Sequence, residues 1–94
     1  MKVKELKDKA AVPEIVLKIT AKDETRDVKG GALKVCNFTG EDETGTVTVA
    51  LWNNDIELVS IGNTIKITKG WSQVYNNSMQ VSSGRFGKLE IVEG

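Results

Sequence analysis

Hydrophobic and polar residues alternate along much of the chain with a period of two, which is typical of strands that face a core on one side and water on the other. Such segments occupy residues 14–22, 45–53, 63–71 and 78–84. A fifth apolar segment, 32–40, has candidate core residues of both parities: Leu33 and Val35 on one, Cys36 and Phe38 on the other. A bulge or strong bend would let this strand serve both sides. The pattern predicts five short strands.

The parity of the other four strands identifies their expected core side chains. These side chains are Ile15, Leu17, Ile19, Ala21, Val47, Val49, Leu51, Ile65, Ile67, Met79 and Val81. In the terminal segment 88–94, Leu89 and Ile91 are expected to cover one end of the same core. The chain is long enough for a single modest core, since a chain of this size buries roughly 60–70% of its unfolded surface.

Residues 53–62 have helical signals in place of strand alternation. Asn53 or Asn54 can cap a helix, and acidic residues near its start favour it. Its apolar side would consist of Ile56, Val59 and Ile61. A single short helix is therefore expected between the third and fourth strands.

Polar segments account for the ends and connections of the chain. Residues 1–12 are a charged lead-in or frayed helical turn that Pro13 would end. Residues 23–31 are a long loop or an extended hairpin tip, and "GEDETG" (40–45) is a polar turn. Five strands with a helix between the third and fourth are the order of an all-β OB fold, a partly open Greek-key barrel. Residues 1–94 are expected to form this one domain.

The largest apolar side chain of the third strand is on the wrong parity for the core. Trp52 alternates with Leu51 and is expected to face outward. In the fourth strand, strict alternation would bury Lys69 without a partner, which is costly. We therefore expect the register to shift at Gly70, a residue suited to a bulge. After the shift Val74 would take the core side, and Trp71 and Tyr75 would share an outer side with Trp52. The alternative is that Trp71 plugs one end of the barrel.

Basic residues accompany these aromatic residues, although the net charge of the chain is zero. Residues 61–89 contain Lys66, Lys69, Arg85 and Lys88 and no acidic residue. Exposed aromatic faces beside cations are what a single nucleic-acid strand requires, because bases stack on the rings and the cations meet phosphates. The candidate nucleic-acid-binding residues are Trp52, Trp71, Tyr75, Lys66, Lys69, Arg85 and Lys34.

Catalytic and metal-dependent functions find little support in the composition. Histidine is absent, so no imidazole can act as a general base or a metal ligand. The single cysteine, Cys36, fits a small core residue better than a nucleophile or a zinc ligand. The acidic run 41–43 fits a solvated turn better than a cation site, and "VKGGA" (28–32) lacks the spacing of a phosphate-binding loop. We expect a binding module that needs no cofactor and is not an enzyme.

Three runs resemble a known family: "DETG-x-V-x-x-x-LW" (42–52), "GNTIKI" (62–67) and "KGW-x-x-x-Y" (69–75). They are similar to the OB domains of archaeal single-stranded DNA-binding proteins of the replication protein A type. In that family the aromatic residues matching Trp52, Trp71 and Tyr75 stack on DNA bases, and the resemblance implies the same roles here. Ser82 stands where some relatives have another aromatic residue, which implies a smaller stacking platform.

The resemblance implies sequence-tolerant binding of single-stranded DNA in replication, recombination or repair. It implies other OB domains or replication and repair proteins as further partners, and a cytoplasmic, chromosome-associated location. No apolar run approaches the roughly 20 residues of a membrane-spanning helix, so no membrane partner is expected. Two alternatives remain open from the residues alone. An OB domain with these aromatic residues can bind RNA, because stacking does not sense the 2′-hydroxyl, or it can bind a protein through an exposed aromatic patch.

Overall fold

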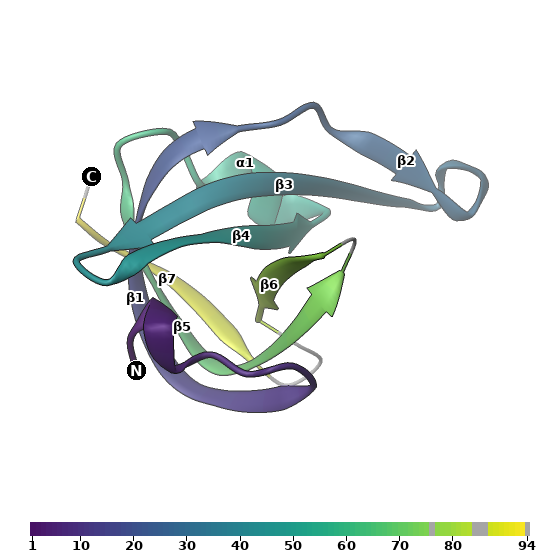
Figure 1. Ribbon diagram of the computed structural model, residues 1–94. Helices are drawn as coiled ribbons and strands as arrows, with labels where there is room; N and C mark the ends of the chain where they lie inside the picture. Colours follow the sequence, from purple (N-terminus) through teal and green to yellow (C-terminus); the bar gives the residue numbers. More distant parts are fainter. Residues whose placement is uncertain (76, 84–86, 94) are drawn as a thin grey trace.

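A computed structural model describes residues 1–75, 77–83 and 87–93 of the chain, which form a small β-barrel with short helical segments (Figure 1). The strands are β1 (Ala10–Lys22), β2 (Arg26–Val28), β3 (Leu33–Asp42), β4 (Gly45–Trp52), β5 (Thr64–Tyr75), β6 (Ser78–Ser82) and β7 (Lys88–Glu93). The helical segments are η1 (Val3–Glu5), η2 (Lys29–Gly31) and α1 (Asn54–Leu58). Within the described residues, α1 is the only α-helix, and no helix has the length and apolar character needed to cross a membrane.

The barrel consists of the five strands that the hydrophobic pattern predicts. They are ordered β1-β3-β4-β6-β5, and pairing of β1 with β5 closes the circle. The pair β4–β6 is parallel and only two residue pairs long, so the barrel is weakly closed on that side. The predicted helix, α1, lies between β4 and β5 and is confirmed. Two shorter strands are additions to this plan: β2 pairs with β3, and β7 pairs with β5.

The core contains almost every side chain that parity assigned to it. Ile15, Leu17, Ile19, Val47, Val49, Leu51, Ile65, Ile67 and Val81 are buried, and Met79 and Leu89 pack against them. Ala21 was assigned to the core wrongly and is exposed. The reason is a shift in the β1–β3 register between Ile19 and Ala21, which reverses the parity of β1 at Thr20. Ile91 was also assigned wrongly, since its side chain is 42% exposed near the end of β7.

The sequence leaves open which side chains of β3 face the core, and the structure decides this without a bulge between β3 and β4. The two strands pair continuously from Val35 opposite Trp52 to Asp42 opposite Gly45. Cys36 and Phe38 belong to the core cluster, so this parity faces inward. Val35 is also buried, but it lies on the outer face, beside Trp52.

The helix α1 is shorter than its sequence signals predict. It contributes Ile56 to the core, and Val59 follows as its C-cap and is buried as well. Ile61 was expected on the same apolar side, but the helix has ended by then and its side chain is 62% exposed. Asn53 stands at the N-cap position without a side-chain capping bond. Its Oδ1 accepts a hydrogen bond from the Lys34 N–H at 3.0 Å instead, and so extends the contact between β3 and β4.

The parity of β5 shifts where Lys69 meets Gly70, so Trp71 faces outward as expected, but β1 changes parity at the same place and the β1–β5 register itself does not shift. The β1–β5 ladder skips Pro13 and Lys69, because Pro13 has no N–H to donate and Lys69 has a φ of 54°. Before this point Ile67 faces inward, and after it Ser72 does, both with no exposed surface. Trp71 consequently points outward.

Val74 was expected to take the core side of β5 after this shift, and this is wrong. It is 46% exposed, because the inward positions after the shift are Gly70 and Ser72, and Val74 lies at the end of the strand beyond the core. The buried Ser72 hydroxyl donates hydrogen bonds to the carbonyls of Lys7 at 2.7 Å and Ala10 at 3.3 Å. The inward position of Ser72 therefore binds the N-terminal segment to β5 through these hydrogen bonds.

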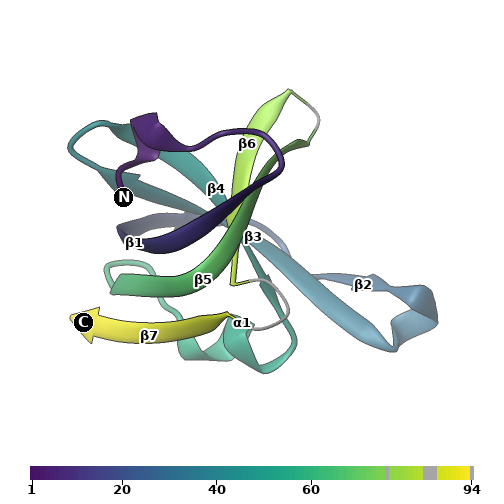
Figure 2. The ribbon, with the colours of Figure 1, turned by 90° about the horizontal axis from the view of Figure 1, so that it is seen from below.

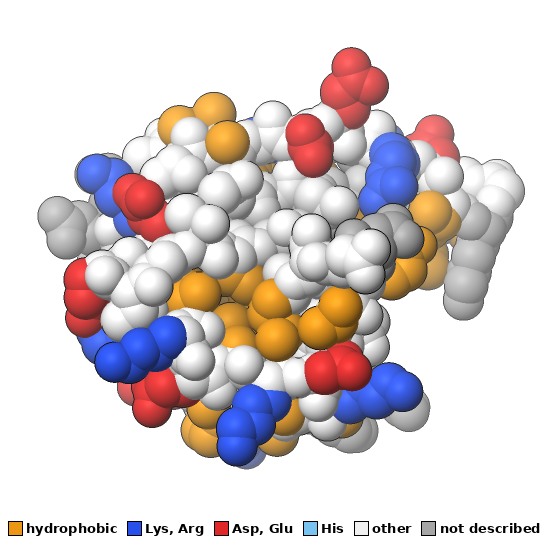
Figure 3. Space-filling model, viewed as in Figure 1, with side chains coloured by type: hydrophobic (Ala, Val, Ile, Leu, Met, Phe, Trp, Pro, Cys, Tyr) orange, Lys and Arg blue, Asp and Glu red, His pale blue; other side chains and the backbone are white. Residues whose placement is uncertain are grey.

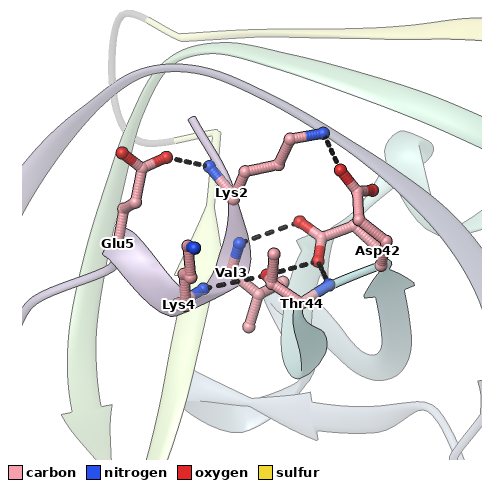
Figure 4. Close-up of polar contacts among 7 residues, drawn as sticks. Lys2, Val3, Lys4, Glu5, Asp42 and Thr44 are labelled. Carbon is pink, nitrogen blue, oxygen red and sulfur yellow. Dashed lines mark hydrogen bonds and ion pairs between the residues drawn. The ribbon is translucent and has the colours of Figure 1, made fainter.

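The N-terminal segment is ordered by the acidic turn between β3 and β4 (Figure 4). Asp42 Oδ2 accepts a hydrogen bond from the Val3 N–H at 2.8 Å, and Thr44 Oγ1 accepts one from the Lys4 N–H at 3.1 Å. Lys2 and Glu43 form an ion pair, and the Val3 side chain packs against the core. The turn predicted as merely solvated is therefore also an anchor for the start of the chain.

Candidate nucleic-acid interface

A long hairpin arm formed by β2, η2 and the first part of β3 projects from the barrel (Figure 2). At its base, Arg26 of β2 is paired with Val35 of β3, and Val35 is paired with Trp52 of β4. Directly opposed residues of adjacent strands share one face of a sheet. Arg26, Val35 and Trp52 therefore form a row across three strands on the outer face.

Trp52 and Tyr75 line one hollow of about 290 Å³ beside this row. Its other walls come from the arm, from β3 and from the β5–β6 hairpin: Arg26, Val28, Val35, Asn37, Gln73 and Gln80. A second hollow adjoins it and shares Arg26, Asn37, Tyr75 and Gln80. We call the two hollows together the groove. Trp52 is 43% exposed and Tyr75 is 57% exposed, so each ring has free surface within it.

Trp71 lies on the same face of β5 as Tyr75 but outside the lining of the groove. Residues 71, 73 and 75 alternate on this face, and Gln73 between the two aromatic residues is part of the groove wall. The cross-strand neighbours of Trp71 are both small, Ala11 on β1 and Ser82 on β6. The indole ring is consequently 41% exposed.

The predicted basic residues are divided among different parts of the surface. Lys69 is exposed and precedes Gly70 and Trp71 in β5, but it lines neither hollow of the groove. Lys34 is exposed on β3, with the parity opposite to that of Val35, and is paired with Asp27 of β2. Arg85 lies outside the described residues.

Lys66 is held on a different face of the barrel, formed by β1, β5 and β7. It is paired with Val16 and Glu90 in the neighbouring strands, and its ammonium group lies 2.9 Å from Glu14 Oε1. The hydrogen bond and the charge of Glu14 raise the pKa of Lys66, and Lys66 in the same way lowers the pKa of Glu14. The structure thus brings Trp52 and Tyr75 together and does not place Lys66 beside them.

Arg26 and the polar groove residues were missed by the sequence analysis. Residues 23–31 contain charged residues and glycines without alternation, so they look like a loop, and the three residues of β2 are recognisable only through their pairing with β3. Asn37, Gln73 and Gln80 carry no charge and no ring. A parity argument extended outward from Trp52 through Val35 would have found Asn37 on the same face.

The surface charge is mixed over the face drawn in Figure 3. Acidic and basic side chains are spread around its edge, and hydrophobic side chains gather in its hollowed middle, below β4. This agrees with the equal numbers of basic and acidic residues, 13 of each. In the described part of the chain, no three His, Cys, Asp or Glu side chains come together as a metal site.

Comparison with known proteins assigns this architecture to a family. The family model "Single-stranded DNA binding protein Ssb-like, OB fold" matches residues 2–91. The single-stranded DNA-binding protein Ssb of Saccharolobus solfataricus is 26% identical over 94 residues, which is 98% of this chain. The chain spans 62% of the length of that relative.

Solved structures share the fold at low sequence identity. A protein from Arabidopsis thaliana has a TM-score of 0.81 at 17% identity, with 100% of this chain and 73% of that chain covered. An OB domain from Thermoplasma acidophilum has a TM-score of 0.80 at 17% identity, with 98% and 85% covered. The second OB-fold domain of replication protein A from Methanococcus maripaludis has a TM-score of 0.77 at 19% identity, with 100% and 95% covered. The predicted OB fold is confirmed.

Proposed function

Because the chain belongs to the Ssb-like family of single-stranded DNA-binding proteins with an OB fold, we propose that it binds single-stranded DNA along the groove with little dependence on sequence. The observation that supports this most directly is the pair Trp52 and Tyr75, two partly exposed rings in one hollow. Stacking of a base on such a ring contributes about 1–3 kcal/mol, and every base has a π-face. Trp71 offers a third ring farther along β5.

Phosphates are met by basic side chains at the margin of these rings. Arg26 borders both hollows of the groove, and Lys69 lies two positions from Trp71 in the chain. A guanidinium group suits this role because it presents several donors in a fixed plane. Arg85 and Lys34 remain proposed contacts, while Lys66 would have to leave Glu14 to reach a phosphate.

The role that follows is binding, with no catalytic step. A protein that covers single strands serves DNA replication, recombination or repair, and we place this chain in those processes. Other OB domains and replication or repair proteins are the partners we propose beside DNA, and the chromosome in the cytoplasm is the location where they would meet. These assignments rest on the family and on the groove together.

A titration followed by tryptophan fluorescence tests the proposal. Oligo-dT should quench the emission, because Trp52 and Trp71 both have exposed indole surface. Duplex DNA of the same length should give a much smaller change, since its bases are not free to stack. Equal quenching by single-stranded and duplex DNA would refute the aromatic platform. Tighter binding of oligo-U than of oligo-dT would reassign the domain to RNA, and no response to any nucleic acid would favour a protein partner.

A further inference from the structure

The two glutamines of the chain lie directly opposite each other in the groove. Gln73 on β5 is paired with Gln80 on β6, and Gln80 is paired on its other side with Thr48 of β4. Both glutamines line the first hollow together with Trp52 and Tyr75. Asn37 of β3 lines the same hollow, so three amide side chains surround the space between the two rings.

The amides have hydrogen-bonding capacity that the protein does not use. Each side-chain amide carries two donors and an acceptor oxygen with two lone pairs. Among the described residues, the side-chain hydrogen bonds join other groups, such as Asn53 to Lys34 and Ser72 to Lys7, and none involves the amides of Asn37, Gln73 or Gln80. All three side chains are of intermediate exposure, so a ligand can reach them.

We propose that these amides hydrogen-bond to the edges of the bases whose faces stack on Trp52 and Tyr75. The inference rests on the proposed function and adds a recognition element to the same groove. An amide is better suited to the polar edge of a base than to a phosphate, which favours charged donors. Asparagine and glutamine already pair with base edges in proteins that bind duplex DNA.

Amides at these positions are compatible with tolerance of sequence. The terminal torsion of glutamine is broad and roughly two-fold, so rotation exchanges the donor and acceptor positions at small cost. The same side chain can therefore match bases that present different edges. The groove would select for the presence of a hydrogen-bonding edge, and not for one particular base.

The test compares oligo-dT with a strand of equal length in which each thymine is replaced by difluorotoluene. This nucleoside has the shape and stacking surface of thymidine but hydrogen-bonds very weakly. The wild-type protein should bind oligo-dT several-fold more tightly, because one neutral hydrogen bond contributes about 0.5–1.5 kcal/mol, or roughly a factor of two to ten. Equal affinity for the two strands would overturn the proposal.

The variant Gln73→Met/Gln80→Met removes both glutamine amides at nearly constant volume. It should lose most of the preference for oligo-dT, and its affinity for the difluorotoluene strand should change little. Thr68→Val is the matched control, since it removes a polar group from the same strand at a position paired with Glu14 and Lys88. Circular dichroism verifies that each variant is folded, and the single variant Gln80→Met replaces the double one if it is not.

The outcomes separate this inference from the proposed function. If the wild-type protein bound both strands with equal affinity, stacking in the groove would still be supported, but the proposed hydrogen bonds from the amides would be refuted. A preference that persists in the Gln73→Met/Gln80→Met variant would refute the two glutamines as its source. Failure of the wild-type protein to bind either strand would refute the proposed function itself.

Discussion

Leu51 and Trp52 are neighbours in β4, yet Leu51 is 1% exposed in the core and Trp52 is 43% exposed in the groove. Leu51→Ala should lower the free energy of unfolding by about 2–5 kcal/mol, because it removes core contacts and leaves a cavity. Trp52→Ala should change stability much less and should weaken binding of oligo-dT by about 1–3 kcal/mol. A thermal melt and a DNA titration measure both quantities. If Trp52→Ala unfolded the domain while Leu51→Ala stayed folded, this orientation of β4 would be wrong.

Ser82 adds no stacking surface beside Trp71. The two residues are directly opposed in the β5–β6 ladder, and Trp71 is 41% exposed. Ser82→Phe should extend the stacking surface and raise the affinity for oligo-dT roughly five- to tenfold, at the low end of the range for an added stacking contact. Ser82→Thr is the control, since it adds bulk without a ring. An equal gain from both variants would mean that the added ring is not what binds.

Arg26 should contribute more to the salt dependence of binding than Lys66 does. Arg26 borders the groove, whereas Lys66 is paired with Glu14 on the β1–β5–β7 face. Arg26→Ala should reduce the magnitude of the slope of log affinity against log salt by about 0.7, which corresponds to one phosphate contact on a single strand. Lys66→Ala should leave the slope nearly unchanged, and Arg26→Lys should retain it. A larger change in slope for Lys66→Ala than for Arg26→Ala would place the DNA backbone on the β1–β5–β7 face.

Acid should loosen the N-terminal segment through Asp42. Partial burial opposes ionisation of this carboxyl, but hydrogen bonds from the Thr44 hydroxyl, the Val3 N–H and the Thr44 N–H outweigh it and lower the pKa below its ordinary value of 3.8. A lowered pKa contributes stability that is complete above the unfolded-state value and is lost as the pH falls through the folded-state value.

Thermal melts of the wild-type protein and Asp42→Ala between pH 7 and pH 2.5 should show this contribution. The difference in melting temperature should be constant above about pH 5 and should shrink as the pH falls below 3.8. Thr46→Ala, on the exposed face of β4, is the control for a substitution near the same turn. A difference that is independent of pH throughout would show that the carboxylate charge is not what anchors the segment.

Local patterns predicted the barrel because each strand has to place apolar residues on one face. The outward Trp52 followed from parity, and the change of parity at Gly70 followed from the cost of burying Lys69. The same reasoning failed at Ala21, where the register shift in β1 involves ordinary residues with no sequence signal. It also failed at Val74, because alternation cannot tell where the core ends along a strand.

The groove was predicted less completely than the barrel. Its rings were found because aromatic residues at outward positions are conspicuous, but its amides and Arg26 were not. Arg26 belongs to the groove only because β2 pairs with β3, a contact made across the tip of the arm. The anchoring of Val3 by Asp42 joins residues 39 positions apart, which no local pattern records.

The bonds that fasten the N-terminal segment determine the order in which the chain can complete its fold. Asp8 Oδ1 accepts a hydrogen bond from the Val74 N–H at 2.8 Å across 66 residues, and Lys7 accepts one from Ser72 across 65. During synthesis Lys7 and Asp8 are made well before Ser72 and Val74, so they must wait for the end of β5 before they find these partners. Contacts of such sequence separation slow barrel formation, because the entropy of closing the loop is lost before they form. Until β5 leaves the ribosome, Ile15 and Leu17 have no partner strand on that side.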